Sequence, residues 1–218
     1  MKAKIKVPTD LNDISLGQYQ MFDLLTKDIE GVFLDQRTVE IFCGISFAEV
    51  ALITHKDVKE VAEDIRELLS GEVEFKHRFK IKTQEFGFIP DFENITSGEF
   101  ADLTSYVGKI EEMHKTMAIL FRPITNKVGD KYDIYPYTGT KDFSDLMKFM
   151  PLGIALGSMV FFWNLANDLK NDIQSSTREE AIQVISTKYP TLTENGVFTE
   201  VSTPLLKVIL EGLTKSVN

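Results

Sequence analysis

The stretch Phe86–Pro123 constrains the fold most, because it places a strand signal, a chain break and a helix start in succession. Its aromatic opening alternates as a strand does and ends at Pro90, and the segment 96–99 (Thr-Ser-Gly-Glu) then has capping-box spacing. In a capping box the N-cap hydroxyl and a Glu or Gln three residues later bond each other's backbone amides. The apolar periodicity that follows predicts one helix over 97–120. Pro123 should lie beyond its end, since proline lacks an amide hydrogen.

The N-terminus carries a fainter copy of this device. Residues 12–19 match 93–100 in order: Ile, then a hydroxyl residue, then Gly two places on, then Gln or Glu, then an aromatic. Ser15 with Gln18 therefore predicts a second capping box, and Ser46 with Glu49 a third. We interpret the repetition as one way of leading the chain into a helix, used twice, and not as a duplicated active site.

The remaining periodicities predict an α+β fold that is predominantly helical, with one or two small β-hairpins. Alternating residues favour an edge strand over 2–7, a hairpin over 72–89 and a second hairpin over 124–136. Amphipathic or capped segments predict helices over 15–25, 38–43, 46–53, 56–69, 141–150 and 152–173. One more is predicted to be capped by Ser176 or Thr177, and a last one to start at Thr203-Pro204. We expect a mainly helical core domain over 1–174. Residues 175–218 are expected to form a C-terminal helical arm, or to belong to the same domain.

Charge and cysteine content narrow the function classes. The net charge is −9 and the pI about 4.9. Binding to nucleic acid or to an anionic membrane depends on Lys and Arg, so neither partner is expected. Cys43 is the only cysteine, which excludes an intramolecular disulfide, and its apolar neighbours indicate a buried structural thiol. The N-terminus has no long apolar region of the kind found in signal peptides, which favours a cytoplasmic origin.

The apolar run Phe149–Asn167 contains no charged residue and approaches the length that spans a bilayer. Its Gly153-x-x-x-Gly157 spacing would favour helix pairing in lipid. Pro151 and the two asparagines 164 and 167 shorten the purely apolar part, however. A helix buried on most sides is the favoured interpretation, with the glycines allowing close approach of a neighbouring element.

Motifs for catalysis or metal binding are weak. Glu111 and His114 have the E-x-x-H spacing of di-iron sites, but such sites need a second copy and two further glutamates. The sequence contains no nucleophile elbow, P-loop or dinucleotide-binding glycine motif. Asp91, Glu93 and Glu99 surround a helix start, where the helix dipole favours carboxylates. We therefore predict no catalytic, cofactor or metal site and no enzyme activity, with an unrecognised enzyme as a remote alternative.

Arg122 is the charge we single out. It lies between Phe121 and Pro123 at the end of an apolar helix, so its guanidinium needs an internal partner. A cation that satisfies the last helix carbonyls is the favoured interpretation. The alternative is that Arg122 contacts a partner protein.

Several segments together resemble a group of tailed-bacteriophage virion-morphogenesis proteins, similar to phage tail assembly chaperones. The segments that carry this resemblance are 16–20 (LGQYQ), 86–90 (FGFIP), 98–103 (GEFADL), 114–118 (HKTMA), 120–124 (LFRPI) and the Phe161-Phe162 pair. They span most of residues 5–170. Relatives in this group often carry Tyr where this chain has Phe100 and Phe121.

The resemblance implies a non-enzymatic protein that acts through protein–protein contacts. Its partners would be other phage structural proteins, namely a tail component or a neighbouring subunit, and it could form a homo-oligomer. A chaperone would work in the host cytoplasm during assembly and keep an apolar tail component soluble. The alternative is a structural subunit of the tail or connector, such as a ring component, which would be retained in the virion.

Overall fold

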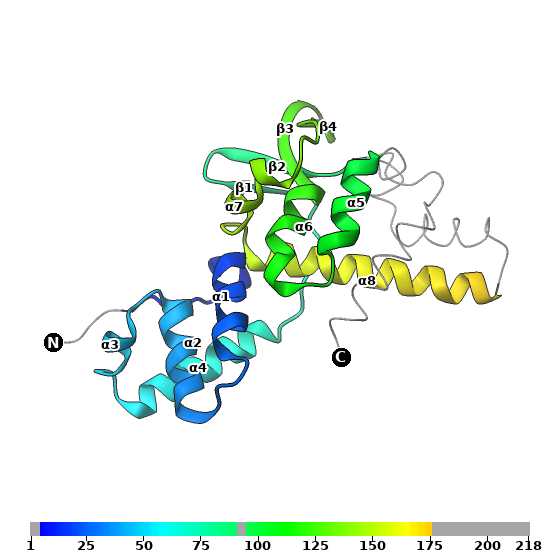
Figure 1. The fold of residues 1–218 in the computed structure, drawn as a ribbon. Helices are drawn as coiled ribbons and strands as arrows, with labels where there is room; N and C mark the ends of the chain where they lie inside the picture. Colours follow the sequence, from blue (N-terminus) through cyan, green and yellow to red (C-terminus); the bar gives the residue numbers. More distant parts are fainter. Residues whose placement is uncertain (1–4, 91–94, 176–218) are drawn as a thin grey trace.

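The computed structural model describes residues 5–90 and 95–175 (Figure 1). These residues form an α+β fold in which helices predominate beside one antiparallel sheet, so the predicted fold class is confirmed. The α-helices are α1 (Leu16–Thr26), α2 (Gly31–Cys43), α3 (Phe47–Val50), α4 (His55–Leu69), α5 (Ser97–Tyr106), α6 (Met113–Leu120), α7 (Ser144–Met147) and α8 (Leu152–Ser175). Short 3-10 turns are η1 (Leu11–Asp13), η2 (Ile110–Glu112) and η3 (Thr140–Asp142).

The sheet consists of the two predicted hairpins joined side by side. Its strands are β1 (Arg78–Ile81), β2 (Gln84–Phe88), β3 (Phe121–Val128) and β4 (Lys131–Ile134), in the order β1-β2-β3-β4. The β2–β3 pairing sets Gly87 opposite Arg122 and Phe88 opposite Phe121. The pairing therefore places Phe86–Phe88, the start of the stretch Phe86–Pro123, beside Phe121–Pro123 at its end.

The predicted first strand is too long. Residues 72–77 alternate as a strand would, yet only 78–81 pair with β2. The preceding residues instead cross α8. Phe75 stacks on Phe161 of α8 at 4.3 Å between ring centroids and meets Phe88 of β2 edge-on at 5.0 Å. Burial of this ring explains the apolar periodicity without a ladder of strand hydrogen bonds.

The single helix predicted over 97–120 is wrong. It is interrupted after Tyr106, where Val107 takes an extended conformation and Gly108 has φ +82°. Glycine adopts positive φ without the steric cost that other residues meet, and it weakens a helix interior. The chain resumes as η2 and α6, and β3 begins at once after Leu120.

A cluster of phenylalanine rings forms the centre of the core. Phe86, Phe88, Phe121 and Phe162 are almost wholly buried. Ring contacts connect β1 to β3 through Phe79 and Phe121, and β2 to α8 through Phe88 and Phe162. Burial of large aromatic rings, with edge-to-face contacts added, dominates the stability of such a core. This accounts for the high phenylalanine content.

Helices α1, α2 and α4 form a separate helical layer, drawn in blue to cyan in Figure 1. The layer is tied to the rest of the chain at the start of α1. There the amides of Leu16 and Gly17 donate to the carbonyls of Met150 and Lys148, both at 2.8 Å. A second, small apolar core consists of Val39, Val50, Val58 and Ala62.

Helix α8 confirms the role predicted for its glycines. A Cβ atom at Gly153 would lie 2.9 Å from the Asn12 side chain, and one at Gly157 only 2.3 Å from the backbone oxygen of Glu74. The glycines thus let η1 and the 72–77 segment pass close to α8. None of the described helices combines the length and the hydropathy that crossing a bilayer requires.

The two ends of the chain fall largely outside the described residues. Residues 5–7 of the predicted edge strand form no strand, and residues 2–4 are not described. The predicted C-terminal arm also lies outside the described residues, apart from Ser175, the last residue of α8.

Candidate functional site

Arg122 lies in strand β3 and forms a buried ion pair with Glu99. The Arg122 Nη2 atom is 2.6 Å from Glu99 Oε1, and the two side chains are only 7% and 5% exposed. The other carboxylate oxygen of Glu99 accepts a hydrogen bond from the amide of Thr96 at 2.6 Å, which completes the predicted capping box. One glutamate therefore caps α5 and neutralises a strand arginine.

Two further side chains surround the pair. The Arg122 guanidinium carbon lies 5.6 Å from the centre of the Tyr137 ring, within cation–π range. The Tyr137 hydroxyl donates to Asp102, and burial together with this carboxylate raises the pKa of Tyr137. Burial lowers the pKa of Arg122, and the charge of Glu99 opposes that shift.

This geometry replaces the predicted role of Arg122 as a helix C-terminal cation. Its guanidinium joins α5 to β3, and within the described residues its Nε atom has no hydrogen-bond partner. A direct contact between Arg122 and a partner protein would require the ion pair to open. We therefore assign Arg122 a structural role, and its contact with a partner protein stays a prediction.

In the E-x-x-H segment Glu111 is exposed, whereas His114 and the intervening Glu112 have contacts within the chain. His114 Nδ1 lies 3.1 Å from the side-chain amide nitrogen of Gln20, and burial lowers the pKa of this histidine. Glu112 pairs with Lys115 at 2.5 Å. Among residues 5–90 and 95–175, no three His, Cys, Asp or Glu side chains are grouped so that they could hold a metal ion.

Cys43 is half-buried rather than fully buried. Burial raises the pKa of its thiol to about 11, so the reactive thiolate is scarce at neutral pH. This agrees with a structural thiol and gives no support to a nucleophile.

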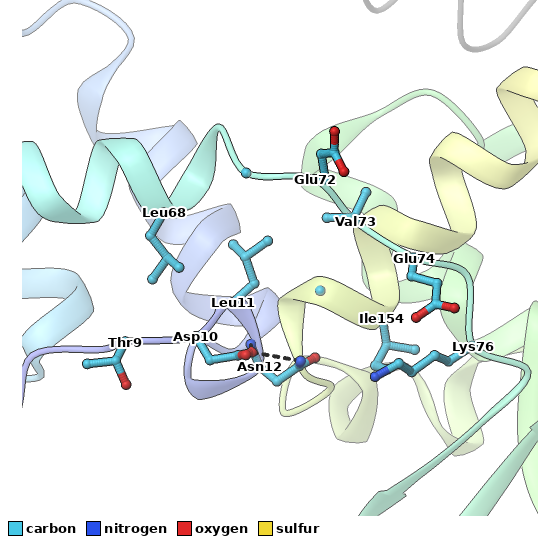
Figure 2. A pocket seen from close by; sticks show the side chains of 12 residues that line it. Thr9, Asp10, Leu11, Asn12, Leu68, Glu72, Val73, Glu74, Lys76 and Ile154 are labelled. Carbon is cyan, nitrogen blue, oxygen red and sulfur yellow. Dashed lines mark hydrogen bonds between the residues drawn. The ribbon is translucent and has the colours of Figure 1, made fainter.

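One pocket of about 260 Å³ lies where η1, the end of α4, the 71–76 segment and the start of α8 meet (Figure 2). Glu72, Glu74 and Lys76 line it on one side and Asp10 on the other. Asp10 already accepts hydrogen bonds from the backbone and side chain of Asn12, both at 2.7 Å. The volume is below the 300–1,000 Å³ usual for small-molecule sites. This pocket lies where η1 and the 71–76 segment pass Gly153, and it is a weak candidate for a ligand-binding site.

The stronger candidate is an exposed apolar surface around the connection of α1 to α2. Met21, Leu24 and Leu25 lie on the last turns of α1, and Val32 and Phe33 on the first turn of α2. Leu24 is 67% exposed and Phe33 65% exposed. We call these five residues the α1–α2 tip. Half of the large hydrophobic residues that are exposed in the described part of the chain belong to it.

Helix geometry explains why the α1 side chains of the tip are exposed. At about 100° per residue, Met21, Leu24 and Leu25 occupy one arc of α1, while Leu16, Tyr19 and Phe22 occupy the opposite arc and pack on the core. An amphipathic surface helix would carry polar residues on its outer arc. Sequence reasoning missed this surface, although the nearly continuous apolar ring around residues 16–25 was a usable signal.

Comparison with models of protein families, with curated proteins and with solved structures finds no match for this chain.

Proposed function

We propose that this protein is a non-enzymatic assembly protein of a tailed bacteriophage, similar to tail assembly chaperones, and that it acts through protein–protein contacts at the α1–α2 tip. The observation that carries this proposal is the exposure of five large apolar side chains close together in the sequence, on both sides of the α1–α2 connection. Large exposed apolar surfaces mark interaction sites in soluble proteins. The phage assignment rests on the resemblance of residues 5–170 described above.

The charge of the chain supports the same function. Asp28 and Glu30 lie in the connection between α1 and α2, both exposed, and they flank the apolar residues with negative charge. A net charge of −9 favours solubility of the chain. Such a surface binds an apolar segment of a partner while the rest of the molecule stays hydrated.

The test compares the double variant Leu24→Ser, Phe33→Ser with the control Leu52→Ser. Leu52 is also apolar and 87% exposed, but it lies on the turn after α3, outside the tip. We expect the double variant to lose co-purification with a tail component when the phage assembly genes are expressed together, and to lower the yield of infectious particles. The control should leave both unchanged.

Mass spectrometry of purified particles separates the two assembly roles. A chaperone is absent from finished particles, whereas a ring or connector subunit persists in them at fixed stoichiometry. Unchanged co-purification and particle yield in a correctly folded double variant would overturn the proposal that the tip makes the contact.

A further inference from the structure

The outer face of the sheet carries a group of basic side chains, although the chain as a whole has a net charge of −9. Arg78 and Lys80 alternate with buried apolar residues along β1, so they point away from the core. Lys82 follows in the turn to β2, and Lys127 of β3 reaches across to the β2 strand. We call the four residues Arg78, Lys80, Lys82 and Lys127 the basic face.

Contacts within the sheet gather the basic face around Glu85. Lys127 Nζ lies 3.1 Å from Glu85 Oε1, and this hydrogen bond, together with the charges of the nearby cations, lowers the pKa of the Glu85 carboxyl. Arg78 pairs at 3.4 Å with Asp130, whose side chain is 90% exposed. The other two lysines of the basic face form no ion pair within the described residues. The basic face therefore keeps more positive charge than its two carboxylates neutralise.

Helix α4 carries the opposite charge on its solvent side. At about 100° per residue, four exposed carboxylates fall within an arc of about 80° around the helix. We call them the acidic stripe: Asp57, Glu60, Asp64 and Glu67. In the part of the chain that the structure describes, none of them forms an ion pair, whereas Glu63 beside them pairs with Lys59 at 3.7 Å.

The two surfaces match in length but are far apart within one chain. At 1.5 Å per residue the acidic stripe is about 15 Å long. The three basic residues of β1 and its turn extend over about 10–13 Å. In Figure 1, α4 lies at the lower left and the sheet at the top, and no described ion pair joins them. Their charges can therefore meet only between two copies.

We propose that the chain associates head to tail, with the basic face of one copy lying on the acidic stripe of the next. Complementary charges fix the orientation of such a contact and disfavour wrong partners. Because two different surfaces meet, each contact leaves one surface of each kind free, and the contact repeats into a ring or an open chain. The inference goes beyond the proposed function, because it involves neither the α1–α2 tip nor an assembly partner.

Sedimentation velocity of the full-length protein tests for this contact. Exposed ion pairs contribute little each, so the association should be weak and dependent on concentration. We expect the average sedimentation coefficient to rise with protein concentration at about 0.05 M NaCl but not at about 1 M, where the Debye length falls to about 3 Å. Association through the apolar α1–α2 tip would instead persist at the higher salt concentration.

Two charge-reversed variants identify the surfaces that meet. Lys80→Glu, Lys82→Glu reverses the basic face, and Glu60→Lys, Asp64→Lys reverses the acidic stripe. Each variant alone should stay monomeric, because neither has both surfaces intact. An equimolar mixture should associate again, since the intact acidic stripe of the first variant meets the intact basic face of the second.

The matched control is Lys109→Glu, Lys141→Glu. It makes the same change of charge as the first variant, at two exposed lysines outside the basic face, and should associate as the wild type does. Circular dichroism checks that every variant is folded. An unfolded variant would not recover in the mixture, so recovery separates loss of the contact from loss of the fold.

Four outcomes would overturn the proposal. A wild type that stays monomeric at low salt would leave the β1 lysines as protection of a sheet edge. An equal loss of association in the control, or a mixture of folded variants that fails to associate, would show that the two surfaces do not meet. Binding of a labelled oligonucleotide to the basic face without self-association would assign this face to nucleic acid. None of these outcomes alters the co-purification result expected for the α1–α2 tip.

Discussion

The two matching capping boxes behave alike locally and differently in three dimensions. At the first, the side-chain oxygen of Gln18 accepts from the Ser15 amide at 2.9 Å, and its side-chain nitrogen donates to the carbonyl of Ile41 at 2.9 Å. At the second, Glu99 accepts from the Thr96 amide and pairs with Arg122. Gln18 therefore supplies a neutral hydrogen bond to another helix, and Glu99 supplies half of a buried ion pair.

The same capping motif is thus placed in two different environments, one with a neutral hydrogen bond and one with a buried ion pair. A typical hydrogen bond contributes about 0.5–1.5 kcal/mol net. Removing one partner of a buried ion pair costs about 3–5 kcal/mol, because an unpaired charge stays buried. The second box should therefore be far more sensitive to substitution than the first.

The largest effect is expected for Arg122→Leu. It leaves Glu99 charged and buried, so the free energy of unfolding should fall by about 3–5 kcal/mol. Urea denaturation followed by circular dichroism measures this change. The matched control is Arg78→Leu in β1, whose partner Asp130 is 90% exposed, and it should cost about 0–1 kcal/mol.

A double variant checks that the ion pair is the cause. Arg122→Leu combined with Glu99→Gln should be less destabilised than the sum of the two single variants, since no charge is then left unpaired. Additive losses would show that the two side chains act independently.

The next effect is expected for Gln18→Glu, which makes the first box resemble the second without supplying an arginine. The carboxylate cannot donate to Ile41, whose carbonyl lies in the last turn of α2, where the helix dipole disfavours negative charge. We expect a loss of about 1–3 kcal/mol at neutral pH. The loss should shrink at acid pH, where a protonated Glu can donate; a loss independent of pH would contradict this account.

Two smaller effects of opposite sign on stability are expected at Gly17 and Gly98, the matching glycines of the two boxes. A Cβ at Gly17 would lie 3.0 Å from the backbone oxygen of Lys148, whereas one at Gly98 would meet nothing closer than the Tyr137 ring at 3.7 Å. Gly17→Ala should therefore lower the melting temperature. Gly98→Ala should stabilise by about 0.4–1 kcal/mol, because alanine restricts the unfolded chain. Equal changes at both sites would contradict the difference in surroundings.

The smallest effect concerns the third box, Ser46 with Glu49, which is exposed. Hydrogen bonds from the Ser46 hydroxyl and amide lower the pKa of Glu49 below its usual value of 4.5. A carboxyl whose pKa is lowered by folding stabilises the fold above its unfolded pKa, and this contribution is lost as the pH falls through the folded value. The stability difference between wild type and Glu49→Gln should therefore narrow below pH 4.5. A difference that is constant across this range would contradict the assignment.

The structural interpretations that succeeded depend on neighbours in sequence. The three predicted capping boxes all form, because their hydrogen bonds join residues three apart. A fourth box, Asp10 with Asp13 at η1, was not predicted. Both hairpins and the close approach at Gly153 and Gly157 followed from alternation and small size. The fold class follows from the same local patterns.

The interpretations that failed depend on contacts between residues that are far apart in the sequence. Helix periodicity continued through Gly108, and it outweighed the one local sign of a break, the glycine itself, at which the chain turns. Alternation over 72–77 reflected contact with α8 rather than strand pairing. A local pattern reports that a residue is buried, and several different partners can bury it.

By itself, the sequence determined where the helices with predicted capping boxes begin, which segments pair as hairpins and that the chain is acidic. Only the tertiary structure decided that Arg122 pairs with Glu99 and that the outer arc of α1 is exposed in the part of the chain that the structure describes. Capping hydrogen bonds form within one helical turn and need no other segment. A buried charge, an exposed apolar face and a pocket are each defined by chain segments far apart, so they exist only once the whole core has packed.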